Sequence, residues 1–317
     1  MRNMIWFVAL IAALFLPQSC GKVEIGPSSN CSYTPSTTHP KAAAFQAVLD
    51  KYTAKGLPGI SALIRDDQGV WVGVSGWADL DARIPMRPCM VSKGASTTKT
   101  FVAVLTLLLA EEGKLSLTDP LEKWLPGEVV EKVKNVRGST IRRLLDHTTG
   151  IADVIEDNDF YLAVLNDPPH KWKPEELIKF VYHDDPLFPV GTDVEYSNTN
   201  YLLLAMVLDK ITGDHSAALR AKVLEPLGLE DTYYYPHDDL PAETAQGYFD
   251  LYNNGTILNL TNYNTGSGNG YGGIYSTVFD LQTFIEALVR EKRVLKPETL
   301  DQMLSFTKPD DGYNREN

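Results

Sequence analysis

The stretch that decides the fold is KGASTTKTF, residues 93–101, in which Ser96 and Lys99 stand three positions apart. Apolar residues continue at helical spacing up to Gly113, which predicts a helix that is buried nearly all round. Residues three apart share one helix face, so the Lys99 amine can reach the Ser96 hydroxyl. A serine becomes a good nucleophile when a neighbouring base takes its proton, and a lysine is such a base when burial or positive charge lowers its pKa. The alternative is an ordinary helix cap followed by a solvated lysine.

A second polar element, YSNTNY at residues 196–201, stands 100 residues downstream. Tyr196 and Asn198, two positions apart, can bring a phenolic oxygen and a carboxamide into one cleft. The phenol could carry protons and the carboxamide could hold an amide substrate. Taken alone, the segment could equally be a helix cap beside an aromatic core residue.

The remaining pattern is a helix, a hairpin and then mostly helices. Apolar and polar residues alternate on both sides of residues 67–69, which predicts an antiparallel hairpin of strands 59–66 and 70–77. Residues 244–277 are rich in Gly, Asn and Tyr and predict loops with short strands. Helices are expected at residues 41–55, 174–182, 200–212, 215–224, 278–290 and 297–306.

Composition limits the class of protein. Of 317 residues, 44% are hydrophobic and 22% are charged, which is enough apolar material for one or two globular units. The net charge is −12 and no basic run occurs, so nucleic acid is not expected as a partner.

The N-terminus has the layout of an export signal. Arg2 precedes a short apolar run, and residues 1–19 are expected to be a signal peptide. Cys20 follows LPQS, a loose form of a bacterial lipoprotein processing site, so lipidation of Cys20 is expected, with cleavage by an ordinary signal peptidase as the alternative. Residues 20–38 then form a tether to a membrane, and the mature protein is a periplasmic or cell-envelope lipoprotein.

The two other cysteines, Cys31 and Cys89, could be bridged in an oxidising compartment or could be two unpaired thiols. Neither has the Cys and His neighbours of a zinc site. We therefore expect no metal and no cofactor.

The motifs occur in an order that resembles the serine β-lactamase and D-alanyl-D-alanine carboxypeptidase family, in the branch of penicillin-binding proteins and class C β-lactamases. The resemblance covers residues 40–306. Besides the Ser96 and Tyr196 elements, the matching segments are GI at 59–60, GWADL at 76–80, GKLSLTDP at 113–120, IRRLLDHTTG at 141–150, EPLGL at 225–229 and GGIYST at 272–277.

This resemblance implies a β-lactamase/transpeptidase-like fold, α/β plus all-α, in which helices flank an antiparallel sheet and a helical domain is inserted. The domain would span residues 39–317, with 39–95 and 278–317 as the α/β part and 96–277 as the mainly helical part. It implies that Ser96 is acylated, that Lys99 and Tyr196 move protons, and that Asn198 binds the substrate amide. The backbone N–H of Ser96 would form half of an oxyanion hole.

The family also has a third motif, Lys or His followed by a small residue and Gly. No segment near Asn317 matches it, and KITG at 210–213 reads as a helix end with Gly213 as its C-cap. We therefore expect the sheet's C-terminal strands to lie beyond Asn317 and these 317 residues alone to be inactive. His147 is expected to be structural, and the tyrosines from Tyr233 onward to pack around loops.

The resemblance predicts an exported serine hydrolase that forms an acyl-enzyme with amide or ester carbonyls. A D-alanyl-D-alanine carboxypeptidase-like peptidase or related esterase is favoured, because export places the protein near cell-wall peptides. A class C-like β-lactamase is the alternative within the enzymes, so the candidate substrates are peptidoglycan-type peptides, esters and β-lactams. A penicillin-binding sensor or an inactive scaffold is the alternative outside the enzymes.

Overall fold

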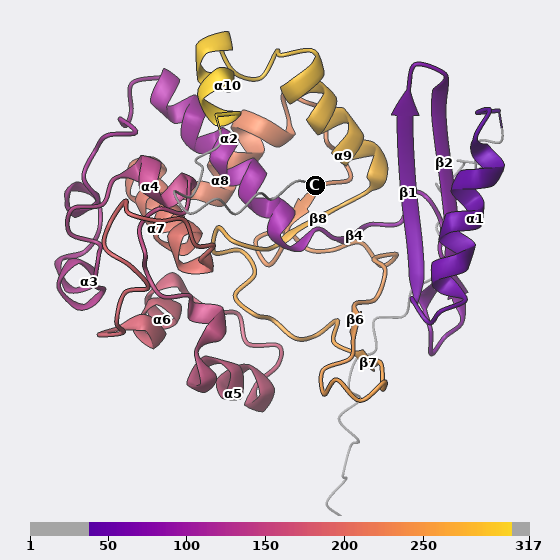
Figure 1. Cartoon of the computed structure of the whole chain (residues 1–317), viewed down its shortest axis with the longest axis horizontal. Coiled ribbons are helices and arrows are strands. Elements are labelled where there is room, and N and C mark those ends of the chain that lie inside the picture. Colours follow the sequence, from indigo (N-terminus) through magenta and orange to yellow (C-terminus); the bar gives the residue numbers. More distant parts are fainter. Residues whose placement is uncertain (1–37, 306–317) are drawn as a thin grey trace, which may run out of the picture.

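A computed structural model describes residues 38–305, and Figure 1 shows their arrangement. The β1–β2 hairpin and α1 lie at one side of the molecule, and the helical body lies at the other. The helices are α1 Ala42–Thr53, α2 Thr98–Glu111, α3 Gly127–Lys132, α4 Ile141–Leu145, α5 Asn158–Asn166, α6 Pro174–Leu177, α7 Asn198–Thr212, α8 His215–Leu219, α9 Val278–Ile285 and α10 Pro297–Met303. The strands are β1 Gly59–Asp66, β2 Gly69–Asp79, β3 Ile84–Pro85, β4 Ser92–Lys93, β5 Tyr233–Tyr234, β6 Tyr248–Phe249, β7 Leu258–Asn259 and β8 Ile274–Ser276.

The predicted hairpin is confirmed as β1 and β2. The two strands pair antiparallel in one register from Gly59 opposite Gly76 to Asp66 opposite Gly69. The short β3 adds a third strand on the far side of β2. Helix α1 packs on β2 and helix α9 packs against β1, so these helices cover the sheet as a layer of helices covers an α/β sheet.

Helix α2 is the centre of the helical body, as its apolar pattern predicts. Ten of its residues are buried, and Phe101 stacks on Phe284 of α9 with ring centroids 3.9 Å apart. Helix α7, whose residues Thr199 to Leu208 are all buried, packs against α2. The two helices that carry the motifs therefore share one core, and their N-terminal ends are held rigidly.

The small sheet β4-β8-β5 fixes the entry to α2. Strand β8 lies between the other two, pairing Lys93 with Tyr275 on one side and Tyr234 with Ile274 on the other. The Ile274 carbonyl accepts a hydrogen bond from the N–H of Gly94 at 2.8 Å, and the Ile274 N–H donates to Thr98 Oγ1 at 2.9 Å. Strand β8 thus clamps the chain on both sides of Ser96.

Most predicted helices are confirmed, with shifted ends. Helix α7 starts at Asn198 and not at residue 200, which puts the carboxamide of Asn198 in the first helical turn. The helix expected at 174–182 is α6 followed by a 3₁₀ turn at Ile178–Val181, and those expected at 215–224 and 278–290 end in π-helical turns. Helices α3, α4 and α5 were not predicted, and they are only 6, 5 and 9 residues long.

Several expectations concern residues outside 38–305. The signal peptide, Cys20, the tether and Cys31 all lie outside the described residues. Cys89 is disulfide-bonded, and both of the chain's other cysteines belong to the part that is not described. Within residues 38–305, no helix combines the length and the apolar character needed to cross a membrane.

Gly270 offers a test of how tightly the loop before β8 is packed. Its φ is +86°, and a Cβ there would lie 2.2 Å from the Tyr201 carbonyl oxygen of α7. Gly270→Ala is expected to lower the free energy of unfolding by about 2 kcal/mol, measured by urea denaturation, because the loop must move away from α7. Gly272→Ala is the matched control, since a Cβ at Gly272 has open space. Equal losses of unfolding free energy in the two variants would contradict this packing.

Candidate active site

Ser96 lies in a 3₁₀ turn, Ala95–Thr97, that leads directly into α2. Lys99 Nζ is 3.3 Å from Ser96 Oγ, so the predicted pair is in contact. Ala95, the residue before the serine, has a φ of +44°, a left-handed conformation that costs a non-glycine residue about 1–2 kcal/mol. The hydrogen bonds from β8 to Gly94 and Thr98 hold this strained residue in place, and the Ser96 beside it is exposed.

Tyr196 approaches the same serine from the chain before α7. Its hydroxyl donates a hydrogen bond to Ser96 Oγ at 2.8 Å. Burial raises the pKa of Tyr196, although the bond to Ser96 opposes this, so the phenol stays neutral near pH 7. Ser96 Oγ therefore sits between an amine and a phenol, each able to exchange a proton with it.

Lys99 is buried and makes three polar contacts. Besides Ser96, its amine donates to Asn198 Oδ1 at 2.7 Å and to the backbone carbonyl of Tyr271 at 3.0 Å. Burial lowers the pKa of Lys99 to about 8, and the negative charge of Asp153 partly opposes that change. An amine with such a pKa exchanges its proton near neutral pH, as a general base must.

Both ends of the Asn198 carboxamide, the oxygen and the nitrogen, form hydrogen bonds with other side chains. Oδ1 accepts from Lys99 and lies 3.5 Å from the Tyr196 hydroxyl, while Nδ2 donates to Asp153 Oδ2 at 2.8 Å. Nδ2 carries two hydrogens, so one is left for a substrate carbonyl. The role of Asn198 in binding an amide substrate stays a prediction.

His147 was expected to be structural, and the structure places it in contact with the site. Its ring packs on that of Tyr196 with centroids 4.7 Å apart, and its backbone φ is +60°. Burial and the charge of Lys99 lower the pKa of His147 to about 4, so the imidazole is neutral. Nδ1 accepts from the N–H of Ser197 and from Asn200 Nδ2, which ties the loop after α4 to the start of α7.

A cavity of about 670 Å³ opens beside Ser96. Ser96, Lys99, His147 and Tyr196 line one part of it. The rest of the wall has an apolar part, formed by Ala103, Leu107, Leu117, Leu145, Val194 and Met303, and a polar part that includes Arg142, Asp146 and Gln302. A cavity with a few convergent polar groups in an apolar wall is the usual form of a small-molecule site.

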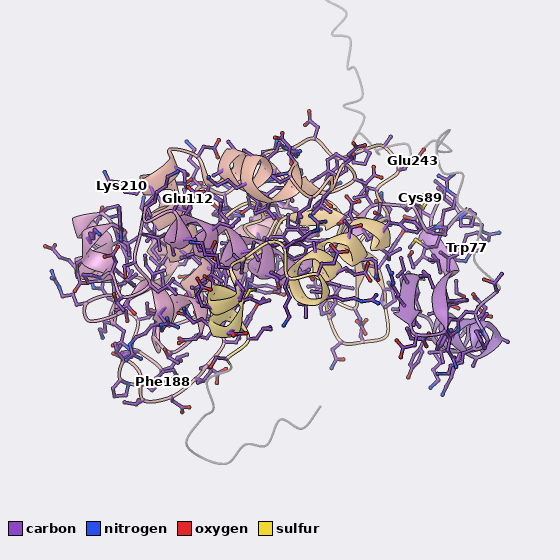
Figure 2. The ribbon with its side chains drawn as sticks, turned by 90° about the horizontal axis from the view of Figure 1, so that it is seen from above. Trp77, Cys89, Glu112, Phe188, Lys210 and Glu243 are labelled. Carbon is purple, nitrogen blue, oxygen red and sulfur yellow. The ribbon has the colours of Figure 1, made fainter. Side chains whose placement is uncertain are left out.

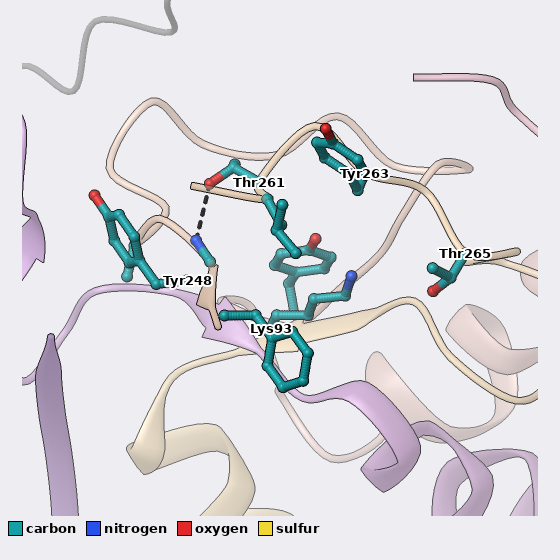
Figure 3. A pocket seen from close by; sticks show the side chains of 10 residues that line it. Lys93, Tyr248, Thr261, Tyr263 and Thr265 are labelled. Atoms are coloured by element: carbon teal, nitrogen blue, oxygen red, sulfur yellow. Dashed lines mark hydrogen bonds between the residues drawn. The ribbon is translucent and has the colours of Figure 1, made fainter. Parts of the chain in front are cut away.

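Three of the tyrosines that were kept out of the predicted site line a second, smaller cavity of about 210 Å³ (Figure 3). Tyr248, Tyr263 and Tyr275 contribute to its wall together with Lys93. Thr261 Oγ1 in this wall accepts a hydrogen bond from the N–H of Gly247 at 2.8 Å. Tyr234 and Tyr271, by contrast, are buried in the hydrophobic core, so packing describes those two tyrosines and a cavity wall describes the other three.

The KITG segment ends α7, as predicted. Gly213 has a φ of +85°, and its N–H donates a hydrogen bond to the backbone carbonyl of Asp209 at the end of the helix. Lys210 lies twelve residues after Asn198 on the same helix, a rise of about 18 Å. Figure 2 shows Lys210 near Glu112 on the helical side, far from Trp77 and the hairpin. This lysine is not part of the site around Ser96.

Two further contributors to the site, Asp153 and the carbonyl of Tyr271, were not predicted from the sequence. Asp153 lies three positions after the end of the recognised block at 141–150, and this position was the only signal. The Tyr271 contact uses a main-chain oxygen, which leaves no trace in residue type. No group of three or more His, Cys, Asp or Glu side chains that could hold a metal occurs in residues 38–305.

Known proteins resemble this chain over much of its length. The family model described as Beta-lactamase matches residues 45–315. Penicillin-binding protein 4* of Bacillus subtilis is 28% identical over 236 residues, which cover 70% of this chain and 50% of that protein. The chain thus spans about half the length of the curated relatives it matches.

Two solved structures carry the comparison further. A D-stereospecific amidohydrolase from Streptomyces sp. is 32% identical with a TM-score of 0.77, covering 86% of this chain and 80% of that one. A D-amino acid amidase from Ochrobactrum anthropi is 28% identical with a TM-score of 0.71, covering 81% of this chain and 74% of that one. Because the Beta-lactamase family model matches most of its length, this chain belongs to the β-lactamase family of serine hydrolases.

Proposed function

We propose that this protein is an exported serine amidohydrolase that cleaves amide bonds at D-amino-acid residues, including the D-alanine end of peptidoglycan-type peptides. The observation that carries the proposal is the position of Ser96 Oγ, 3.3 Å from the Lys99 amine and 2.8 Å from the Tyr196 hydroxyl. These three groups can activate a nucleophile and return a proton to a leaving group.

The reaction would proceed through an acyl-enzyme. Neutral Lys99 takes the Ser96 proton as Oγ attacks the substrate carbonyl carbon. When the carbon–nitrogen bond breaks, the leaving amine receives a proton through Tyr196, and the acyl group stays on Ser96. Water then attacks the ester and gives one proton to the Lys99–Tyr196 pair. The pair passes this proton to Ser96 Oγ as the Oγ–carbon bond breaks, which releases the acid and restores the Ser96 hydroxyl and the neutral amine.

The choice of substrate class rests on two observations. The two structures described above are named as a D-stereospecific amidohydrolase and a D-amino acid amidase, so a preference for D-residues fits this fold. The apolar wall of the large cavity suits an apolar side chain or acyl group beside the scissile carbonyl. Ester hydrolysis would follow the same steps, because Ser96 attacks the carbonyl carbon in both substrates. An ester is the more reactive acyl donor of the two.

The test compares substrates on the natural full-length protein. We expect release of ammonia from D-phenylalanine amide and of D-alanine from a stem peptide, with L-phenylalanine amide cleaved far more slowly. Rapid turnover of nitrocefin without release of either D-amino acid would instead show a class C-like β-lactamase. Failure of a fluorescent penicillin and a fluorophosphonate to label Ser96 would show an inactive scaffold, and stable penicillin labelling without turnover a sensor.

We also propose that the protein is exported and anchored through a lipid on Cys20, on the strength of the N-terminal pattern. Metabolic labelling with a tagged fatty acid, followed by cell fractionation, tests this. A membrane-associated, labelled protein that loses its label in Cys20→Ala is expected. Cleaved but unlabelled protein would point to an ordinary signal peptidase, and cytosolic protein would contradict export.

A further inference from the structure

Asp153 contacts the site without facing Ser96. It precedes the 3₁₀ turn Val154–Glu156, and its two carboxylate oxygens have different partners. Oδ1 accepts from the N–H of Ile155 at 3.1 Å, which caps the turn. Oδ2 accepts from Asn198 Nδ2 at 2.8 Å, which reaches the first turn of α7. One side chain therefore joins the loop after α4 to a residue that contacts Lys99.

The carboxylate decides which way the Asn198 amide points. An ionised carboxylate only accepts hydrogen bonds, so it must face the NH₂ group of Asn198. The amide oxygen then faces the Lys99 amine at 2.7 Å. A flipped amide would set its NH₂ group against the amine of Lys99 and its oxygen against the carboxylate, which makes both contacts unfavourable.

Asp153 also sets the charge balance around Lys99. The titratable groups that surround this amine are the neutral imidazole of His147 and the phenols of Tyr196, Tyr201 and Tyr271, with Asp146 also on the cavity wall. Asp153 is the charged residue that opposes the effect of burial on Lys99. Asp146, by contrast, binds the hydroxyl of Thr148 at 2.6 Å.

We propose that Asp153 is a positioning residue that fixes the Asn198 carboxamide toward Lys99 and places a negative charge behind it, thereby setting the pH range in which Ser96 is activated. The activity readouts rest on the proposed hydrolase function. Asp153 itself transfers no proton and does not contact the reacting atoms.

Two substitutions separate the two effects. Asp153→Asn keeps an acceptor for Asn198 but removes the charge, so the acid limb of the pH profile of kcat/KM is expected to move down by about one pH unit, with a several-fold lower plateau. The sign follows because losing a nearby negative charge lowers the pKa of Lys99, and the free amine then persists at lower pH. Asp153→Ala also frees the amide, and its plateau is expected to fall by about 100-fold.

Asp157 provides the matched control. Four residues along the chain, it caps α5 by accepting from the N–H of Phe160 at 2.7 Å, without a bond to the site. Asp157→Asn keeps a cap of the same kind and Asp157→Ala removes it, so each is expected to change stability as the matching Asp153 variant does, while the acid limb and the plateau of kcat/KM stay unchanged. An unchanged acid limb in Asp153→Asn would overturn the proposal. Equal losses of plateau kcat/KM in the Asp153 and Asp157 variants would also overturn it.

A second measurement does not need turnover. In protein with ¹³Cε-labelled lysine and the Ser96→Ala substitution, NMR titration gives the pKa of Lys99 directly. A fall of about one unit on adding Asp153→Asn, and none on adding Asp157→Asn, supports the proposal. An unchanged Lys99 pKa overturns it. If the titration shows the fall but the wild-type protein cleaves no substrate, the proposed hydrolase function fails and the positioning role of Asp153 stands.

Discussion

Ser96→Ala is expected to abolish formation of the acyl-enzyme and to lower kcat/KM by at least about 10³-fold. Both Lys99 and Tyr196 contact the Ser96 hydroxyl, and alanine leaves those two residues without a nucleophile to activate. Intact-mass spectrometry after incubation with a fluorophosphonate measures the loss directly, because the covalent adduct on the full-length protein disappears.

Thr97→Ala is the control for this substitution. Thr97 ends the same 3₁₀ turn, its side chain makes no capping hydrogen bond to α2, and it is exposed. The variant therefore removes a neighbouring hydroxyl without touching the contacts of Ser96, and near-normal labelling is expected. Full labelling of Ser96→Ala would mean that another residue is the nucleophile, and the proposed mechanism would be wrong.

The contact between Ser96 and Lys99 could be predicted because it is local. The two stand three positions apart, and helical geometry alone puts their side chains on one face. The approach of Tyr196 and Asn198 to this pair could not come from spacing, since 100 residues intervene; it was expected from the family resemblance, and the structure brings all four residues together.

Asp153 and Tyr271 show where sequence reasoning stops. The Asp153 contact spans 45 residues, and a lone aspartate in a loop is a common cap or surface residue. Tyr271 contributes only its carbonyl, which every residue has. Long-range packing of α2, α7 and β8 creates both contacts, and no periodic pattern encodes that packing.

The missed helices have a related cause. Helices α3 and α4 span fewer than two turns, so neither contains enough residues to show a period of 3.6. Such short helices are stable because they bury residues such as Val129, Val130, Ile141 and Leu144 in the helical core. Tertiary packing, not helix propensity, decides that they form.

Lys99→Met is expected to lower kcat/KM by about 10³-fold, because methionine matches the length of lysine but cannot take the Ser96 proton. The pH dependence of kcat/KM in the wild-type protein is a second test of Lys99 as the base. Burial lowers the pKa of Lys99 to about 8, so below that pH the amine is protonated and kcat/KM falls as the pH falls. The acid limb should vanish with the lysine, as measured by kcat/KM from pH 5 to 10.

Lys99→Arg separates a base from a mere positive charge. The guanidinium keeps the charge but holds its proton at all accessible pH values, so this variant should be as inactive as Lys99→Met. Lys114→Met is the matched control, since Lys114 lies just beyond the other end of α2 in an exposed ion pair with Glu112. If Lys99→Arg kept most of the activity, Lys99 would act through its charge, and a different group would have to take the Ser96 proton.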